Sequence, residues 1–463
     1  MNSLQIVTWF KNSKKTKNFF FFLLSIVLAL VLTRLLRDSG FTDSQDYVLF
    51  LLFFSIGLWL TEAIPPFAVA LFIMAYLVFM LGNPRLNEKP ENISKYVNTF
   101  SNSIIWLMLG GFFLAEAMTK TGIDLYFFRF SLKLSGNKPK HILLGLMLTT
   151  MVASMILSNT ATTSMVIASV MPLLSRQQGK SLSRAILAGV PMAASLGGMG
   201  TIIGSPPNAI AIGALENNGI HLSFLKWMSF GIPLSLVLTL AGWWLLQWKF
   251  VDDNQPVQID VPAASSDDSR DKKTNRSIVL VVLILTVLLW LTSSLLQLTV
   301  ASISVLPIVS LTMTGILTAS DIRKLPWDTL LLVAGGLSLG LSLQETHLLE
   351  HFTHHILGTG WNTVVLLIVF AYITMFFSNI MSNTATSTIL IPLGLFMVPQ
   401  DALRIAVTVG LAASTALLLP VSTPPNAIAY STGLIKQRDF LFGGLLVGLL
   451  GPILIVAFVL MLV

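Results

Sequence analysis

Long apolar runs occur throughout this sequence, and they restrict the folds available to the chain more than any other feature. Three of them, residues 19–36, 185–200 and 441–463, approach or exceed the length of about 20 residues that crosses a bilayer as a helix. Only 11% of the 463 residues are charged, whereas a soluble domain carries about 25%. We therefore expect an all-α polytopic membrane protein embedded in a lipid bilayer.

The positions of the charges predict an orientation. The formal net charge is +7, but the cations gather in short loops between apolar runs, which is the positive-inside pattern and argues against a nucleic-acid partner. Four lysines, Lys11, Lys14, Lys15 and Lys17, precede the first run. That run has no small-residue cleavage site, so we expect a retained helix with a cytoplasmic N-terminus in the plasma membrane. The chain has no cysteine, which excludes disulfides and thiolate metal sites.

Four short motifs occur twice in the same order, which indicates an internal repeat. The motif LWLT occupies 58–61 and 289–292, GG occupies 110–111 and 335–336, SNTAT occupies 158–162 and 382–386, and PPNAI occupies 206–210 and 424–428. A hydrophilic stretch separates the two sets. We predict a first repeat over 1–250, a cytoplasmic linker over 251–276 and a second repeat over 277–463.

Each repeat contains an apolar segment that a polar Ser-Asn-Thr tip interrupts, over 141–175 and 361–399. Basic residues flank both ends of the first segment, which predicts a re-entrant hairpin that opens inward. The second has few flanking cations and is expected to open outward. Each repeat also contains a helix broken before its Pro-Pro-Asn motif, over 185–215 and 402–430. Repeats of opposite topology are the architecture of many secondary transporters.

The hairpin tips and helix breaks can provide ligands for both a cation and an anion. A broken helix leaves N–H groups unpaired at one end and carbonyls at the other; the first attract anions, and the second suit Na⁺. No Arg or Lys lies within either hairpin, so bound Na⁺ would supply the charge that holds an anion. Ser and Thr also mediate helix packing in membranes, but two tips, each paired with a break, favour two equivalent cation sites that flank one substrate pocket.

Other polar residues have competing interpretations. The cluster at 347–355 contains His347, His351, His354 and His355. Its helical spacing is compatible with a metal or proton site, and we favour the polar face of an interfacial helix. Glu62 could be functional or could cap a helix end. Glu116 is expected to pair with Lys120 at the i, i+4 spacing.

The paired tips, the two breaks and the repeat arrangement together resemble the divalent anion/sodium symporter family, which includes sodium–dicarboxylate, citrate and sulfate carriers. The resemblance covers essentially the whole chain. It implies about eleven transmembrane helices plus two re-entrant hairpins, a homodimer, and an elevator-type movement of a transport domain against a scaffold.

The resemblance also implies ligands, motif by motif. It places one sodium site at Ser154, Ser158, Asn159 and Gly204, and another at Ser378, Ser382, Asn383 and Ser422, several of them acting through backbone carbonyls. It places contacts to substrate carboxylates at Asn159, Thr160, Ser205, Asn383, Thr384, Thr423 and Pro424. The chain departs from the family at Ser378-Asn379-Ile380-Met381, where many relatives have Thr followed by an acidic residue.

We therefore expect sodium-driven uptake of a C4-dicarboxylate such as succinate. The alternatives of the same fold are a dicarboxylate exchanger and a sodium-coupled citrate or sulfate carrier. An intramembrane enzyme would need a nucleophile with a base, or metal ligands, within the spans, and the sequence has no such set. A channel is disfavoured because two inverted hairpins that meet at one site imply alternating access.

Overall fold

The computed structural model describes residues 3–38, 40–86, 92–176, 181–251, 270–348 and 362–462. Within these ranges the secondary structure is entirely helical. Most of the predicted linker, and three of the four clustered histidines (His351, His354 and His355), lie outside the described residues.

The helices before the linker correspond to the first predicted repeat. In chain order they are α1 (Ser3–Leu36), α2 (Asp43–Thr61), α3 (Pro66–Gly82), α4 (Ser94–Val97), η1 (Asn98–Ser101), α5 (Ser103–Thr121), α6 (Ile123–Ser135), α7 (Pro139–Ala153), α8 (Asn159–Arg176), α9 (Ser181–Gly197), η2 (Gly198–Gly200), α10 (Pro206–Asn217) and α11 (Phe224–Phe250). The predicted hairpin is the pair α7 and α8, and the predicted broken helix comprises α9, η2 and α10.

The helices after the linker follow the same order. They are α12 (Arg270–Leu296), α13 (Val300–Met313), α14 (Ala319–Ile322), α15 (Trp327–Glu345), α17 (Thr363–Ser378), α18 (Asn383–Met397), η3 (Pro399–Asp401), α19 (Ala402–Ala412), η4 (Ala413–Thr415), α20 (Pro424–Ser431) and α21 (Gln437–Leu462). The range predicted as the second hairpin contains α17 and α18, and the range predicted as the second broken helix contains α19, η4 and nearly all of α20.

Many of these helices have the length and composition of membrane spans. Among the described residues, seven helices are long and apolar enough to cross a bilayer. The stretches 383–397 and 399–415 would add one span, bent by 114°. Four shorter helices, α3, α7, α13 and α17, are also apolar. The structure thus confirms a multi-pass, all-helical membrane protein.

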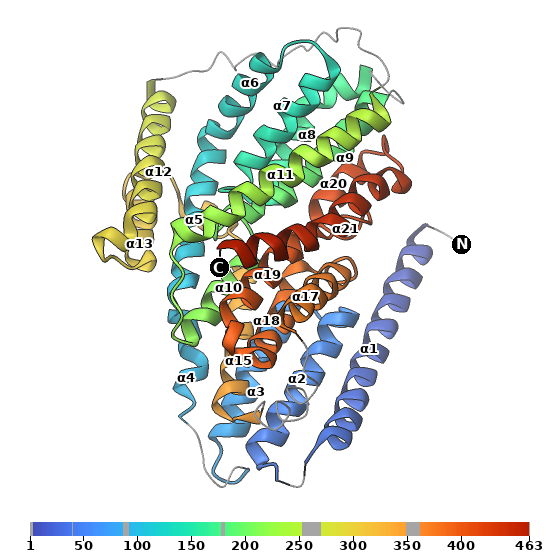
Figure 1. Ribbon diagram of the computed structural model, residues 1–463, viewed down its shortest axis with the longest axis vertical. Helices are drawn as coiled ribbons and strands as arrows, with labels where there is room; N and C mark the ends of the chain where they lie inside the picture. Colours follow the sequence, from blue (N-terminus) through green and yellow to red (C-terminus); the bar gives the residue numbers. More distant parts are fainter. Residues whose placement is uncertain are drawn as a thin grey trace.

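The helices of the two halves pack against each other in matching pairs. Helix α5 packs along α13 and helix α3 packs along α15. Helix α10 contacts α18 and α19, while α20 contacts α8 and α9. Helices α12 and α13 lie at one side of the molecule and α1 at another (Figure 1), and α1 packs mainly against α2.

The repeated Gly-Gly motif makes the closest of these crossings possible. A Cβ atom on Gly110 of α5 would lie 2.8 Å from the Cβ of Ser304 on α13. A Cβ on Gly335 of α15 would lie 2.5 Å from the Cβ of Ala70 on α3. Only glycine lets the two backbones approach so closely, which is a common use of small residues in membrane helices.

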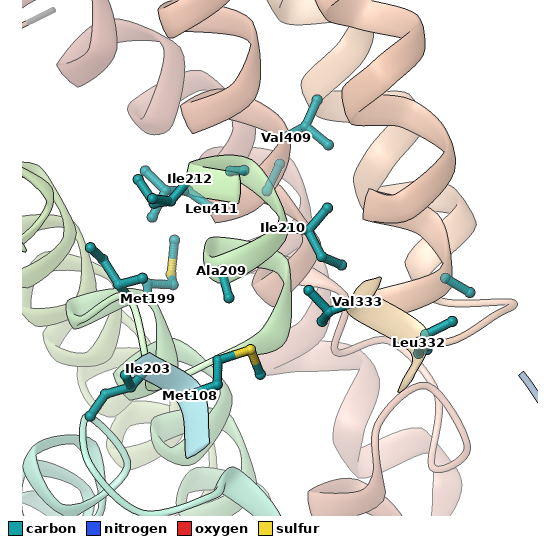
Figure 2. Packing of buried hydrophobic residues seen from close by; sticks show 14 of the residues in the cluster. Met108, Met199, Ile203, Ala209, Ile210, Ile212, Leu332, Val333, Val409 and Leu411 are labelled. Atoms are coloured by element: carbon teal, nitrogen blue, oxygen red, sulfur yellow. The ribbon is translucent and has the colours of Figure 1, made fainter. Parts of the chain in front are cut away.

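Helix α10 lies in the apolar core between the two halves. Figure 2 shows Ile210 and Ile212 of this helix among Met199, Val333 and Leu411, which come from η2, α15 and α19. These side chains are buried. The packing fixes where α10 begins, and that end carries one of the two Pro-Pro-Asn motifs.

Candidate functional site

Both hairpin tips and both helix breaks line one cavity of ≈ 910 Å³. Residues 158–161 and 380–384 come from the tips, and residues 203–207 and 421–425 come from the breaks. The structure therefore brings together segments that lie more than 200 residues apart in the sequence. The lining includes eleven of the predicted site residues: Ser158, Asn159, Thr160, Gly204, Ser205, Ser382, Asn383, Thr384, Ser422, Thr423 and Pro424. The remaining two, Ser154 and Ser378, are buried at the ends of α7 and α17.

Four helices begin at this cavity. Helices α8 and α18 start at Asn159 and Asn383, and helices α10 and α20 start at Pro206 and Pro424. Proline suits the first position of a helix because its missing N–H would have no intrahelical partner there. Each N-terminus carries a partial positive charge of about +0.5. The cavity is therefore suited to an anion, although the tips contain no basic side chain.

The local sequence explains why the helices start where they do. Ser158 and Ser382 each accept a hydrogen bond on Oγ from the amide three residues later, at 3.1 Å in both tips. Thr423 Oγ1 accepts from Asn426 N at 3.3 Å at the start of α20. Such caps satisfy one of the N–H groups that a helix start leaves free.

Oxygen atoms converge behind the first tip. Ser154 Oγ donates to Asn159 Oδ1 at 2.6 Å. A Cβ atom on Gly204 would lie 2.8 Å from the carbonyl oxygen of Gly198 and 3.1 Å from that of Ser154. A Cβ on Gly198 would lie 2.9 Å from Asn159 Oδ1. Neutral oxygens of this kind are suited to a hard cation. The carbonyl oxygen of Gly198 belongs to the cluster, although Gly198 was not predicted as a site residue.

The second tip has a different hydrogen-bond pattern. Ser378 Oγ and Asn383 Oδ1 are buried and have no partner within the described part of the chain. Ser422 Oγ donates to Asn379 Oδ1 at 2.8 Å, and the same oxygen of Asn379 accepts from Leu418 N at 2.9 Å. Buried oxygens without partners cost about 1–3 kcal/mol each, and a cation would satisfy them. The hydrogen bonds of the two clusters therefore differ.

The asparagine of each Pro-Pro-Asn motif holds its helix break in shape. Asn208 Nδ2 donates to the carbonyls of Gly198 at 2.8 Å and Thr201 at 2.7 Å. Asn426 Nδ2 donates to Leu419 O at 2.9 Å. Both side chains are buried. No role was predicted for Asn208 and Asn426, although the repetition of their motif in the sequence was the available signal.

Charged residues lie at one end of the cavity. Its lining includes Glu62, Glu116 and Lys324, and Lys324 is the only cation among the described lining residues. The predicted pairing of Glu116 with Lys120 is wrong, because Lys120 Nζ lies 2.5 Å from Asp321 Oδ2 instead. Asp321 lies in the short helix α14 between α13 and α15, and its Oδ2 also accepts hydrogen bonds from Thr318 N and Oγ1. Glu62 caps α2 in a left-handed conformation with φ 49°, and it also lines the cavity.

Helix α10 begins at the cavity and contacts helices of both halves. This helix packs against α5 and α15, and Ser103 Oγ at the start of α5 donates to Glu216 Oε2 at 2.5 Å. Helix α20 has no matching extended contact with α5 or α15 among the described residues. At its start and end, Val421 is 81% exposed and Tyr430 is 46% exposed. Helix α10 is thus packed against α5 and α15, whereas Val421 before α20 and Tyr430 within it are exposed.

Known proteins are similar in sequence to most or all of this chain. The profile of the citrate transporter family matches residues 56–408. The sodium-dependent dicarboxylate transporter SdcS of Staphylococcus saprophyticus is 30% identical, covering 100% of this chain and 96% of that protein. SdcS of Staphylococcus aureus strain USA300 is 29% identical, covering 98% of this chain and 94% of that protein.

Solved structures share the fold at much lower identity. MtrF of Neisseria gonorrhoeae has a TM-score of 0.58 at 15% identity and covers 87% of this chain and 96% of its own. The YdaH transporter of Alcanivorax borkumensis has a TM-score of 0.54 at 13% identity, and the match covers 86% of this chain and 97% of the YdaH chain. The family profile spans most of the chain and SdcS matches all of it. The chain therefore belongs to the divalent anion/sodium symporter family and is a transport protein, not an enzyme.

Proposed function

We propose that this protein is a secondary active transporter that couples uptake of a C4-dicarboxylate such as succinate to the entry of Na⁺. The observation that carries this proposal is the cavity at which four helix N-termini lie beside two clusters of neutral oxygen atoms. Helix N-termini favour carboxylates, and carbonyl, hydroxyl and amide oxygens at helix breaks favour Na⁺. The names of the sodium-dependent dicarboxylate transporters among the relatives point the same way.

The coupling would follow from the charge balance of the site. A dianion in this cavity meets no basic side chain that belongs to either tip; Lys324 is the one cation among the described lining residues. Two Na⁺ ions behind the tips would supply the missing positive charge at short range, where the effective dielectric is low. In this proposal the assigned sodium ligands are Ser154, Ser158, Asn159 and Gly204 in one half and Ser378, Ser382, Asn383 and Ser422 in the other. The proposed substrate contacts are Asn159, Thr160, Ser205, Asn383, Thr384, Thr423 and Pro424.

The proposed mechanism is alternating access by two inverted repeats, 1–250 and 277–463, joined by the linker. Support comes from the matching contacts of α5 with α13 and of α3 with α15, and from those of α10 with α18 and of α20 with α8. We assign α7–α11 and α17–α21 to a moving transport domain, and α2, α3, α5, α12, α13 and α15 to a scaffold. About eleven spans, two re-entrant hairpins and an elevator-type movement complete the proposal.

The conformation fits an inward-open state under the proposed orientation. Positive-inside topology puts the N-terminus, Lys120 and Lys324 on the cytoplasmic side of the plasma membrane. Lys324 lines the cavity, and α10 packs against α5 and α15 whereas α20 has no comparable contact with them among the described residues. Sliding the transport domain so that α20, instead of α10, packs against the scaffold would open the site outward.

The proposal is tested by uptake into proteoliposomes that contain the purified protein. Radiolabelled succinate should accumulate when Na⁺ is outside, and accumulation should stop when choline replaces Na⁺. Equal uptake in choline would refute sodium coupling. Uptake that requires succinate inside the vesicles but not Na⁺ would identify an exchanger, and stronger competition by citrate or sulfate than by succinate would assign those substrates.

Two substitutions connect this activity to the cavity. Asn159→Ala and Asn383→Ala should each abolish uptake while the purified protein keeps its size-exclusion profile, including the homodimer expected for this family. Asn218→Ala is a matched control, because Asn218 is an exposed residue at the far end of α10 whose Nδ2 donates to Ala214 O. Normal uptake by both Asn159→Ala and Asn383→Ala would show that the proposed site assignment is wrong.

A further inference from the structure

The side chain of Asn379 connects the second hairpin to the second helix break. It follows the last residue of α17, and its carboxamide is buried. Its Oδ1 accepts from Ser422 Oγ at 2.8 Å and from Leu418 N at 2.9 Å, while its Nδ2 donates to Met375 O at 2.9 Å. One side chain thus bonds its own hairpin and two residues of the segment before α20.

The first half makes the same connection without a side chain at this position. Met155 lies three residues before Ser158, just as Asn379 lies three residues before Ser382. The Met155 carbonyl accepts a hydrogen bond from Thr201 Oγ1, and Thr201 Oγ1 accepts from Gly204 N at 3.0 Å. Here the backbone of the hairpin is the acceptor, so the identity of the side chain at residue 155 does not matter to this bond.

Each helix break contains a hydrogen bond between a backbone N–H and a side-chain hydroxyl three residues apart. The residue that carries the hydroxyl comes first in one half and last in the other. In the first half the hydroxyl belongs to Thr201, and the amide that donates to it belongs to Gly204. In the second half the hydroxyl belongs to Ser422, which corresponds to Gly204, and it accepts from Leu419 N at 3.0 Å. The Ser422 hydroxyl reaches the backbone carbonyl of Asn379 only at 3.5 Å, whereas it donates to the side-chain Oδ1 of Asn379 at 2.8 Å, so the side chain supplies the shorter bond.

Steric contacts explain why a hydroxyl-bearing residue occupies this position only in the second half. A Cβ on Gly204 would meet backbone atoms at 2.8 to 3.1 Å, so a serine does not fit there without a backbone shift. The second cluster accommodates both Ser422 and Asn379. It also keeps Ser378 Oγ and Asn383 Oδ1 buried without partners in the described residues, so these two oxygens take no part in the connection.

We propose that Asn379 is a positioning residue for the second cation site: it holds residues 418–422 against the hairpin so that the site is formed before Na⁺ arrives. This inference rests on the proposed sodium coupling. A preformed site lowers the ordering cost of binding. A carboxamide is suited to this role because it accepts two bonds and donates a third, and it adds no charge beside the dianion.

The test measures the Na⁺ concentration that gives half-maximal effect, in uptake and in thermal stabilisation of the substrate-free protein. Asn379→Ala should raise this concentration by about three- to tenfold, the effect of losing roughly one buried hydrogen bond. Ser422→Ala keeps the backbone carbonyl and should produce a similar rise. The double variant should be no worse than either single one, because both remove the same connection.

A rescue variant and a matched control separate positioning from general stability. Asn379→Asp keeps both acceptor bonds and should bring the half-maximal Na⁺ concentration back to or below that of the wild type. Gln45→Ala removes a buried carboxamide in α2, whose Nε2 donates to Thr346 O at 3.0 Å away from the cavity; it should lower the melting temperature and leave the Na⁺ dependence unchanged.

The outcomes distinguish this inference from the proposed function. If the wild type responds to Na⁺ but Asn379→Ala shifts only the melting temperature, as Gln45→Ala does, the positioning role is wrong and sodium coupling stands. Additive shifts in the double variant would also overturn it. If the wild type shows no response to Na⁺ in either readout, the proposed function fails and the inference fails with it.

Discussion

The hydroxyl of Ser154 donates to the side-chain oxygen of Asn159 at 2.6 Å, whereas the corresponding oxygens of Ser378 and Asn383 have no partner in the described chain. A cation behind the first tip therefore adds to oxygens that already share a bond. A cation behind the second tip would satisfy two buried oxygens that are otherwise unpaired. The second site should gain more free energy from the same ion.

The first prediction compares these two serines. Ser378→Ala should raise the half-maximal Na⁺ concentration for thermal stabilisation by about three- to tenfold, whereas Ser154→Ala should change it less, because one hydrogen bond is worth about 1 kcal/mol. Both alanines remove one buried hydroxyl, so each variant serves as the control for the other. An equal or larger shift in Ser154→Ala would contradict the inequality of the sites.

The second prediction concerns Gly204. Gly204→Ala would place a methyl group 2.8 Å from the carbonyl oxygen of Gly198 and 3.1 Å from that of Ser154, which forces backbone to move in the first oxygen cluster. We expect uptake to fall at least tenfold. Gly448→Ala is the matched control, because its nearest neighbour is the flexible Met375 side chain at 3.5 Å. Normal uptake by Gly204→Ala would show that the cluster is not used.

A third prediction tests the movement of α15 against α18. A Cβ on Gly336 would lie 2.3 Å from Thr388 Cγ2, across the proposed boundary between scaffold and transport domain. Gly336→Ala should slow succinate uptake while Na⁺-dependent binding is retained, since the cavity is lined by other residues. Loss of both uptake and binding in Gly336→Ala would instead indicate damage to the fold. Unchanged uptake would mean that α15 and α18 do not slide against each other during transport.

A fourth prediction concerns pH and the short helix α14 between α13 and α15. Hydrogen bonds from the Lys120 ammonium and from Thr318 hold the pKa of Asp321 well below its usual range. A lowered native pKa stabilises the fold above the unfolded pKa of about 3.9 and loses this effect as the pH falls below it. The melting temperature of the wild type should therefore drop more between pH 6 and about 3 than that of Asp321→Asn. Identical pH profiles would show that the ion pair adds nothing.

Much of the fold could be predicted because it depends on patterns that survive in the sequence alone. Apolar length reveals membrane helices, and the repeated motifs mark the tips and the breaks. The tip serines and the breaks before Pro206 and Pro424 lie where they were predicted, because helix capping and proline geometry are local. All four segments line one cavity.

The details of the site could not be predicted, because they depend on contacts between distant segments. The exchange of the hydroxyl between Thr201 and Ser422 is visible only when each hairpin lies beside its break. Glu116 is the one acidic residue of α5, and its i, i+4 spacing from Lys120 favours a pair between them. The structure places Asp321 closer, because α5 packs along α13 and presents Lys120 to the following helix α14. The spacing of residues along the sequence does not indicate that Asp321 lies beside Lys120.

Equilibrium binding tests the central claim, that Na⁺ supplies the charge that holds a dianion in the cavity. Radiolabelled succinate would be bound to the purified protein in NaCl and in choline chloride at the same ionic strength. We predict saturable binding in NaCl that weakens at least tenfold in choline, and its loss in Asn159→Ala and Asn383→Ala. Succinate binding of the same affinity in both salts would contradict the account.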